Sequence, residues 1–210
     1  MGATGSGKTT LINGMINFIL GVEWDDDFRF KIIVESGSMS QAFSQTSAVT
    51  AYEIHYTDGF KIPYSLTIVD TPGYGDTKGL SHDQFITANI RQFFEDQCGI
   101  QEVDAVGFVS QASLPRLTPT QIYIFDSVLS IFGKDIQENV QFLLTFADSQ
   151  EPPVLAAIQE AKIPCPLDDD GFPQHHKFNN SGFFAANKGP DAIATRFNNV
   201  MTIKILLLLF

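Results

Sequence analysis

The first nine residues constrain this chain most, because they match the pattern G-x-x-x-x-G-K-[ST] in full and a helical pattern follows at once. Glycines let successive backbone N–H groups turn inward around an anion, and a helix beginning near Lys8 points its positive dipole end at the same place. Lys8 would reach nucleotide phosphates, and the Thr9 hydroxyl would bind Mg²⁺. The pattern predicts a P-loop (residues 2–8) with the candidate nucleotide contacts Gly2, Gly5, Ser6, Gly7, Lys8, Thr9 and Thr10.

Beyond the P-loop, strand-like apolar runs alternate with helical patterns. The spacing predicts helices over residues 11–20, 83–97, 118–133 and 153–162, and strands over residues 51–56, 64–69, 105–109, 140–146 and 177–179. Strands separated by helices predict an α/β fold, in which helices flank both faces of a mostly parallel sheet. Residues 1–200 are expected to form this P-loop domain, followed by an apolar tail of unknown role over residues 201–210.

A P-loop normally follows a buried central strand, and here only Met1 precedes it. We therefore expect the first strand to be missing from the chain as written, either because the chain is a fragment or isoform or because the gene model begins late. An absent central strand leaves backbone groups and apolar surface unpaired, so the sequence predicts a domain of low stability.

The composition narrows the range of partners. The 210 residues include 13 Lys and Arg against 24 Asp and Glu, a formal net charge of −11. This balance disfavours a nucleic-acid partner, which selects basic surfaces, but it does not disfavour a small phosphate ligand. Two cysteines, Cys98 and Cys165, suit a reducing compartment, and we expect a cytoplasmic protein. The apolar end, 205–210, is shorter than the roughly 20 residues of a membrane-spanning helix, and membrane contact stays open.

A second phosphate motif, D-T-P-G, follows an apolar strand pattern at residues 70–73. A carboxylate at the carboxyl end of a strand lies where α/β sheets bind ligands. We expect Asp70 to hold Mg²⁺ through water and the Gly73 N–H to sense a γ-phosphate. A nucleotide switch also needs a threonine whose hydroxyl binds Mg²⁺. Thr50 is the first choice and Thr46 the second, although both also fit an ordinary loop or strand edge. The predicted metal ligands are Thr9, Thr50 and Asp70.

The stretches G-A-T-G-S-G-K-T-T-L-I-N, at residues 2–13, and D-T-P-G-Y-G-D, at residues 70–76, resemble the septin-like GTPases. They are most similar to the immunity-associated GIMAP group (AIG1-type), and L-P-R-L-T at residues 114–118 resembles an additional box of that group. The resemblance implies a P-loop G domain that binds GTP or GDP with Mg²⁺. It also implies a homodimer or homo-oligomer that forms across the nucleotide face.

A guanine site needs a carboxylate, because guanine presents its N1–H and exocyclic amine as a pair of donors and adenine does not. The resemblance implies that Asp148, at the end of the sequence T-F-A-D, accepts from these donors. Phe146 stands where the family has a lysine, and its ring would cover the base by stacking. Asp148 is alternatively a cap for the next helix. The resemblance also implies a nucleotide contact by Asn180, in a stretch that equally fits a turn.

Ras-like enzymes orient the attacking water with a glutamine directly after D-x-x-G, and here Tyr74 takes that place. We therefore expect GTP hydrolysis that is slow or depends on a second subunit. The resemblance implies an arginine supplied by that subunit, for which Arg116 is the candidate, with a surface ion pair as its alternative role. The candidate catalytic residues are Arg116 and Thr50. Two other functions remain open, a nucleotide-binding scaffold without turnover and an ATP-using P-loop protein.

Overall fold

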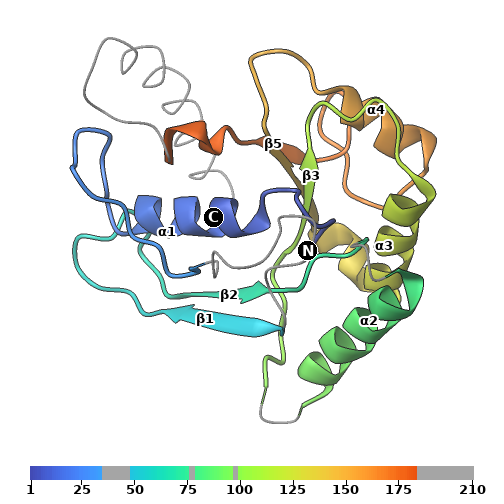
Figure 1. The fold of residues 1–210 in the computed structure, drawn as a ribbon, viewed down its shortest axis with the longest axis horizontal. Helices are drawn as coiled ribbons and strands as arrows, with labels where there is room; N and C mark the ends of the chain where they lie inside the picture. The colour runs from blue at the N-terminus through green and yellow to red at the C-terminus, as the bar shows by residue number, and fades with distance from the viewer. Residues whose placement is uncertain (35–47, 76–78, 97–98, 184–210) are drawn as a thin grey trace.

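The computed structural model describes residues 1–34, 48–75, 79–96 and 99–183 (Figure 1). The expectations for Thr46, Asp76, Cys98 and the tail 201–210 lie outside the described residues. In chain order, with η marking a 3₁₀ helix, the elements are α1 (Lys8–Ile19), β1 (Thr50–Ile54), β2 (Leu66–Asp70), α2 (Leu80–Glu95), β3 (Val106–Gln111), α3 (Pro119–Leu129), η1 (Lys134–Asn139), β4 (Val140–Thr145), α4 (Pro153–Glu160), β5 (His175–Lys177) and η2 (Asn180–Phe183). None of the helices in these ranges has the length and apolar character needed to cross a bilayer.

The predicted α/β fold with a parallel sheet is confirmed, but the strands are divided between two sheets. β3, β4 and β5 are parallel and lie in the order β3-β4-β5. β1 and β2 form an antiparallel hairpin in which Thr50 lies opposite Asp70. A turn at Asp58-Gly59 lies between these two strands.

The two sheets are connected at the start of the chain. Gly2 forms an isolated parallel bridge with Val109 of β3, and Ala3 forms one with Tyr74, which follows β2. The Met1 carbonyl accepts a hydrogen bond of 2.8 Å from the Val109 N–H. Residues 1–3 therefore lie between β2 and β3 over a short length, at the place of the strand that normally precedes a P-loop.

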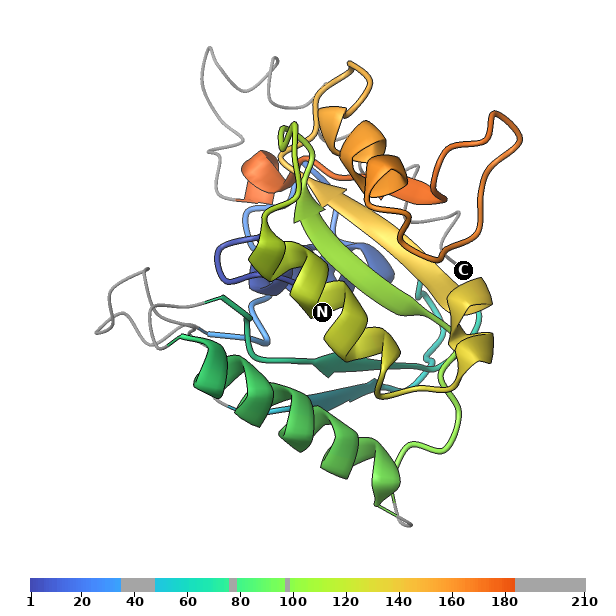
Figure 2. The ribbon, with the colours of Figure 1, turned by 90° about the vertical axis from the view of Figure 1, so that its right-hand side faces the viewer.

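Helices cover both faces of the parallel sheet. Figure 2 shows α3 in front of β3 and β4, and α1 behind them. Under α3, the rings of Phe108, Phe125 and Phe142 pack together with centroids between 4.5 and 6.0 Å apart. On the other face, apolar side chains of α1 pack with Val109 and Leu143. Because side chains alternate along a strand, β3 supplies both cores, and the P-loop is held between them.

The two helices beside the P-loop begin in different ways. α3 begins as predicted, since the Thr118 hydroxyl accepts from the Gln121 N–H, the Gln121 side chain accepts from the Thr118 N–H, and Pro119 follows the cap. α1 has Gly7 as its N-cap, and no described side chain caps it. The first N–H groups of α1 are therefore suited to an anion rather than to a capping side chain.

Candidate functional site

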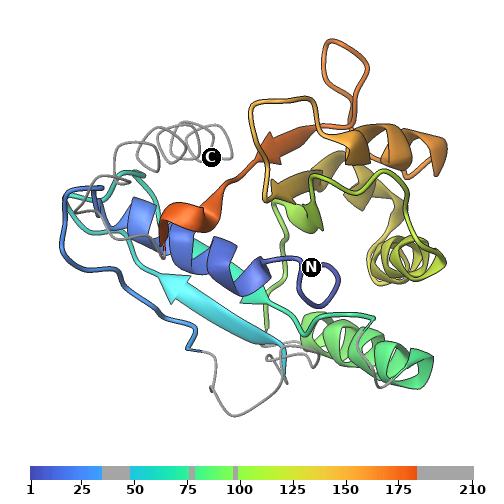
Figure 3. The same ribbon diagram turned by 45° about the horizontal axis from the view of Figure 1, so that its top comes forward.

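The P-loop turns from the first residues of the chain into α1, and Figure 3 shows it between the end of β2 and β3. Gly2 lies so close to β3 that a Cβ atom on it would be 2.3 Å from the Val109 carbonyl oxygen. Gly7 has a φ of 87°, a left-handed conformation that favours glycine. Glycine is therefore required at position 2 by its close approach to β3, and at position 7 by its left-handed backbone conformation.

The side chain of Lys8 folds back into the P-loop. Its ammonium group donates hydrogen bonds to the Gly2 and Ala3 carbonyl oxygens, at 3.1 and 2.8 Å. Burial lowers the pKa of Lys8 from 10.5 to about 8, and the negative charge of Asp70 opposes part of this shift. An anion beside this ammonium would favour its charged form, so the site is electrostatically suited to phosphate.

The second phosphate motif runs along the P-loop. The Thr4 N–H donates to the Tyr74 carbonyl at 2.7 Å, and the Tyr74 N–H donates to the Gly2 carbonyl at 3.3 Å. A Cβ atom on Gly73 would lie 2.6 Å from Thr4 Oγ1 and 3.1 Å from Lys8 Nζ. The structure therefore brings the two predicted motifs together, with Gly73 next to the lysine ammonium.

The predicted metal ligands lie on adjacent elements. Asp70, which is 2% exposed, ends β2, and Thr50 faces it at the start of β1. Thr9 lies in the first turn of α1. Next to Asp70, the hydroxyl of Thr71 is buried and has no hydrogen-bond partner among the described residues. One carboxylate together with hydroxyl oxygens is a donor set that suits Mg²⁺.

Tyr74 lies in the core and not in the site. Its side chain is 0% exposed and packs with Ile86 and Ile90 of α2. Its hydroxyl is 3.4 Å from Thr87 Oγ1, and burial raises the pKa of Tyr74 to about 12. A neutral phenol held in this core does not reach a solvent water beside the P-loop.

Sequence reasoning missed Thr145, the last residue of β4. Its side chain is 1% exposed, and its hydroxyl donates to the Ser6 carbonyl at 2.7 Å and lies 3.2 Å from the Ser110 carbonyl. Thr145 also lies next to Gly7, since a Cβ atom on that glycine would be 3.4 Å from the threonine methyl group. A hydroxyl residue at the end of an apolar strand, just before the candidate base motif, was the available signal.

The loop after β4 presents the candidate base-binding residues at the surface. Asp148 is exposed, and its Oδ1 accepts a hydrogen bond of 2.8 Å from the Gln150 N–H. Phe146 is 65% exposed and has a φ of 53°, which is unusual for a bulky residue. The N-cap of α4 is Pro152, so Asp148 does not fill the alternative role of capping that helix.

Asn180 and Arg116 lie on different elements, Asn180 at the start of η2 and Arg116 between β3 and α3. Phe178, two residues before Asn180, accepts a hydrogen bond of 3.1 Å from the Ala147 N–H, so the two candidate base loops are neighbours. The Asn180 side chain lies against α1, with Oδ1 3.4 Å from the position of a Cβ on Gly14. Arg116 is exposed in the β3–α3 loop and forms no ion pair within the part of the chain that the structure describes.

The P-loop at the start of α1, the parallel sheet and the helices on both faces define the fold of a GTPase G domain. No protein-family model matches the sequence, and no curated protein matches it.

Solved structures of Toc33 from Arabidopsis thaliana share this fold. The structure in complex with GDP and Mg²⁺ has a TM-score of 0.63 at 15% identity, and the complex with Mg²⁺ and GMPPNP has a TM-score of 0.58 at 15% identity. A dimerisation-deficient Toc33 mutant has a TM-score of 0.59 at 14% identity. Each of these similarities covers 100% of this chain and 80% of the Toc33 chain. At such identities the similarity establishes the fold.

Proposed function

We propose that this chain is a guanine-nucleotide-binding switch protein of the septin-like kind, related to the GIMAP group, that binds GTP and GDP with Mg²⁺. The observation that carries the proposal is the buried Lys8 ammonium, enclosed by the P-loop at the first turn of α1. A bound phosphate would take over from the Gly2 and Ala3 carbonyl oxygens as its partner. Toc33, which has the same fold, has been solved with GDP and Mg²⁺.

Thr9, Thr50 and Asp70 would hold the Mg²⁺, whose charge would stabilise the phosphates. Thr50 and Asp70 are cross-strand partners, so one pair of strands carries both. Asp148 would accept from the guanine N1–H and amine, and Phe146 would cover the base. The exposure of both side chains and the left-handed backbone at Phe146 support this role, since such conformations cluster at ligand sites.

Hydrolysis is proposed to be slow unless a second subunit takes part. The burial of Tyr74 supports this, because the chain then lacks a water-orienting side chain at that position. Arg116 is exposed and is the candidate for a residue that completes the site of a partner subunit. For Toc33 and Toc159, dimerisation is described as important for the GTPase activity. The same burial of Tyr74 favours a scaffold without turnover as the second candidate function.

Binding of a fluorescent GTP analogue tests the P-loop. Charge-assisted hydrogen bonds to phosphate contribute about 1.5–3 kcal/mol, so Lys8→Ala is expected to weaken binding at least about tenfold. Lys61→Ala is the matched control, because Lys61 forms an ion pair with Glu23 on the surface. Unchanged affinity in Lys8→Ala, or no binding of any purine nucleotide by the folded protein, would contradict the proposal.

Base specificity is tested by competition among GTP, ATP and xanthosine triphosphate. Xanthine has a carbonyl where guanine has its amine, so Asp148→Asn is expected to lower the affinity for GTP and raise that for xanthosine triphosphate. An ATP-using protein would instead bind ATP better than GTP before and after this substitution.

Single-turnover phosphate release at increasing protein concentration separates a GTPase from a scaffold. An arginine supplied in trans contributes roughly 10³ to 10⁵ in rate, so Arg116→Ala should remove the concentration-dependent acceleration while GTP affinity stays the same. Release at the rate of buffer alone, at every protein concentration, would instead favour the scaffold.

A further inference from the structure

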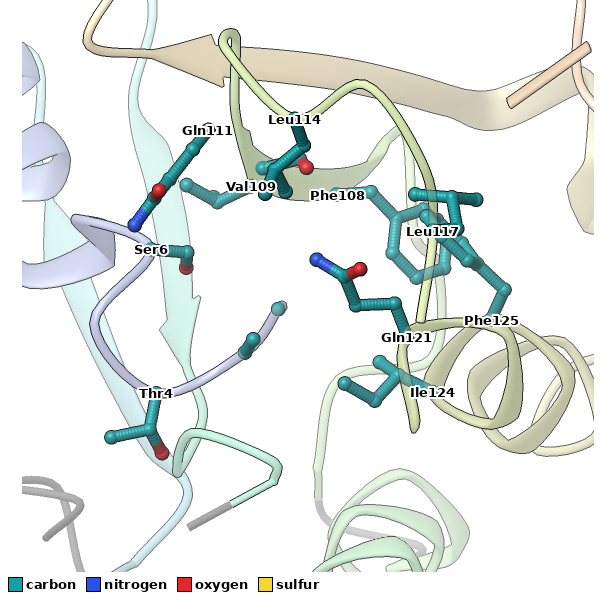
Figure 4. Close-up of a pocket in the computed structure, with 13 residues that line it drawn as sticks. Thr4, Ser6, Phe108, Val109, Gln111, Leu114, Leu117, Gln121, Ile124 and Phe125 are labelled. Atoms are coloured by element: carbon teal, nitrogen blue, oxygen red, sulfur yellow. The ribbon is translucent and has the colours of Figure 1, made fainter. Parts of the chain in front are cut away.

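A cavity of about 150 Å³ lies between the P-loop, β3 and α3 (Figure 4). Gly2, Thr4 and Ser6 line one side of it, and residues of β3 and α3 line the other. The cavity shares Gly2 and Ser6 with the proposed nucleotide contacts, whereas Lys8, Thr9 and Asp70 are not among its lining residues.

The P-loop side of this cavity carries a hydroxyl without a partner. Ser6 is 4% exposed, and its Oγ has no hydrogen-bond partner among the described residues. The Gln121 carbonyl oxygen already accepts from the Thr118 N–H at 2.8 Å, and Figure 4 shows its amide nitrogen turned toward the P-loop. A buried hydroxyl left unpaired costs free energy, which a polar atom of a ligand would recover.

The other side of the cavity is apolar. Phe108, Leu117 and Phe125 line it, and Figure 4 shows them grouped away from Ser6. A protein cavity of about 150 Å³ has room for a molecule of the size of benzene. Leu114 and Leu117, which flank Arg116, both belong to the lining, so an occupant contacts the P-loop and the loop that carries the candidate arginine.

We propose that this cavity binds a small monocyclic aromatic molecule with one hydroxyl group, a ligand of the phenol class. The ring packs among Phe108, Leu117 and Phe125, and the hydroxyl forms a hydrogen bond with Ser6 Oγ. The site does not depend on the identity of the nucleotide, so it can be tested in the protein without one.

Binding of 4-fluorophenol and 4-fluorotoluene to the whole chain, followed by ¹⁹F NMR, tests the site. Both probes are expected to bind, because both fit the apolar wall. Ser6→Ala should lower the affinity for 4-fluorophenol relative to 4-fluorotoluene about fivefold, the effect of one net hydrogen bond. Leu117→Trp, which fills the cavity, should abolish binding of both, whereas Leu167→Trp at a 60% exposed position should not.

Three outcomes would overturn the proposal. If neither probe binds the wild-type protein at millimolar concentration, the cavity holds water only. If Leu117→Trp folds and still binds both probes, they bind elsewhere. If Ser6→Ala leaves the ratio of the two affinities unchanged, the Ser6 hydroxyl does not recognise the ligand. This last test does not need Leu117→Trp, so it can be made even if that variant fails to fold.

Discussion

The hydroxyl of Thr145 supports the P-loop from β4 through its hydrogen bond to the Ser6 carbonyl. Thr145→Val keeps the shape of the side chain and removes this donor, leaving two buried carbonyl groups without it. We expect a loss of about 1–2 kcal/mol in the free energy of unfolding and weaker nucleotide binding, because the backbone of Ser6 loses its support. Denaturant unfolding and nucleotide titration measure the two effects. Thr145→Ser is the control, and a valine variant that binds nucleotide like the wild type would exclude a positioning role.

Sequence reasoning at the residue scale succeeded where a local pattern determines the geometry. The close approach of Gly2 and the left-handed Gly7 follow from the P-loop motif itself. Thr145 was not predicted because its hydrogen bond joins residues 139 positions apart, which only the folded sheet brings together. The position of Tyr74 in the core could not be predicted either, because the motif specifies the backbone after Gly73 but not the direction of the next side chain.

The lowered pKa of Lys8 predicts a pH dependence of stability. Burial places this pKa at about 8 in the folded chain, against 10.5 as the ordinary value. Between these values the unfolded chain binds more protons, so the free energy of unfolding rises with pH. We expect an increase of about 1.5 kcal/mol from about pH 8 to 9.5 that is absent in Lys8→Met. Parallel urea titrations of both proteins measure it, and equal slopes would show that Lys8 titrates as in water.

At the scale of elements, α1 holds a neighbouring extended segment through two buried asparagines. Asn17 Oδ1 accepts from the Phe30 N–H at 2.8 Å, and its Nδ2 donates to the Phe30 carbonyl at 2.7 Å. Asn13 Oδ1 accepts from the N–H groups of Ile32 and Ile33, at 2.9 and 3.1 Å. The side chains of a helix therefore take the place of a paired strand for this segment.

Asn17→Ala should release the segment from α1. It removes the partner of both the N–H and the carbonyl of Phe30, a residue that is 45% exposed, and each hydrogen bond lost contributes about 0.5–1.5 kcal/mol net. We expect faster hydrogen exchange of the Phe30 amide and a lower free energy of unfolding. Asn139→Ala is the control, because Asn139 donates to the Asp104 carbonyl at an exposed site. Equal exchange of the Phe30 amide in both variants would show that the segment does not depend on Asn17.

The ends of helices and strands could be predicted from the sequence where they depend on residues close by in the chain. α3 starts at Pro119, as the predicted helix over residues 118–133 requires, because its capping residues act within one turn. Its end was predicted near Gly133, but the helix stops at Leu129, before the 3₁₀ helix η1. β5 lies at residues 175–177 and not 177–179, because the Phe142 N–H bonds to the Gln174 carbonyl and the Phe178 N–H to the Leu144 carbonyl. This register is set by β4 and not by the local sequence.

At the scale of the whole molecule, the strands of the two sheets differ in how deeply they are buried. β3 and β4 are mostly buried, whereas β1 alternates half-buried and exposed positions and, within the described residues, pairs only with β2. The sequence predicted one mostly parallel sheet, because strand patterns carry no information on where a sheet is interrupted. An isolated two-stranded sheet is marginally stable in water, so the hairpin depends on its contacts with α1.

The hairpin is therefore expected to open before the parallel sheet does. In native-state hydrogen exchange, protected amides of β1 and β2 should exchange at least about tenfold faster than those of β3 and β4, since opening the hairpin exposes less buried apolar surface. GDP with Mg²⁺ should reduce this difference if Thr50 and Asp70 hold the metal, because the ligand then joins the ends of the two hairpin strands to the P-loop. Equal exchange in the two sheets without nucleotide would mean that residues 1–3 already connect them into one cooperative unit.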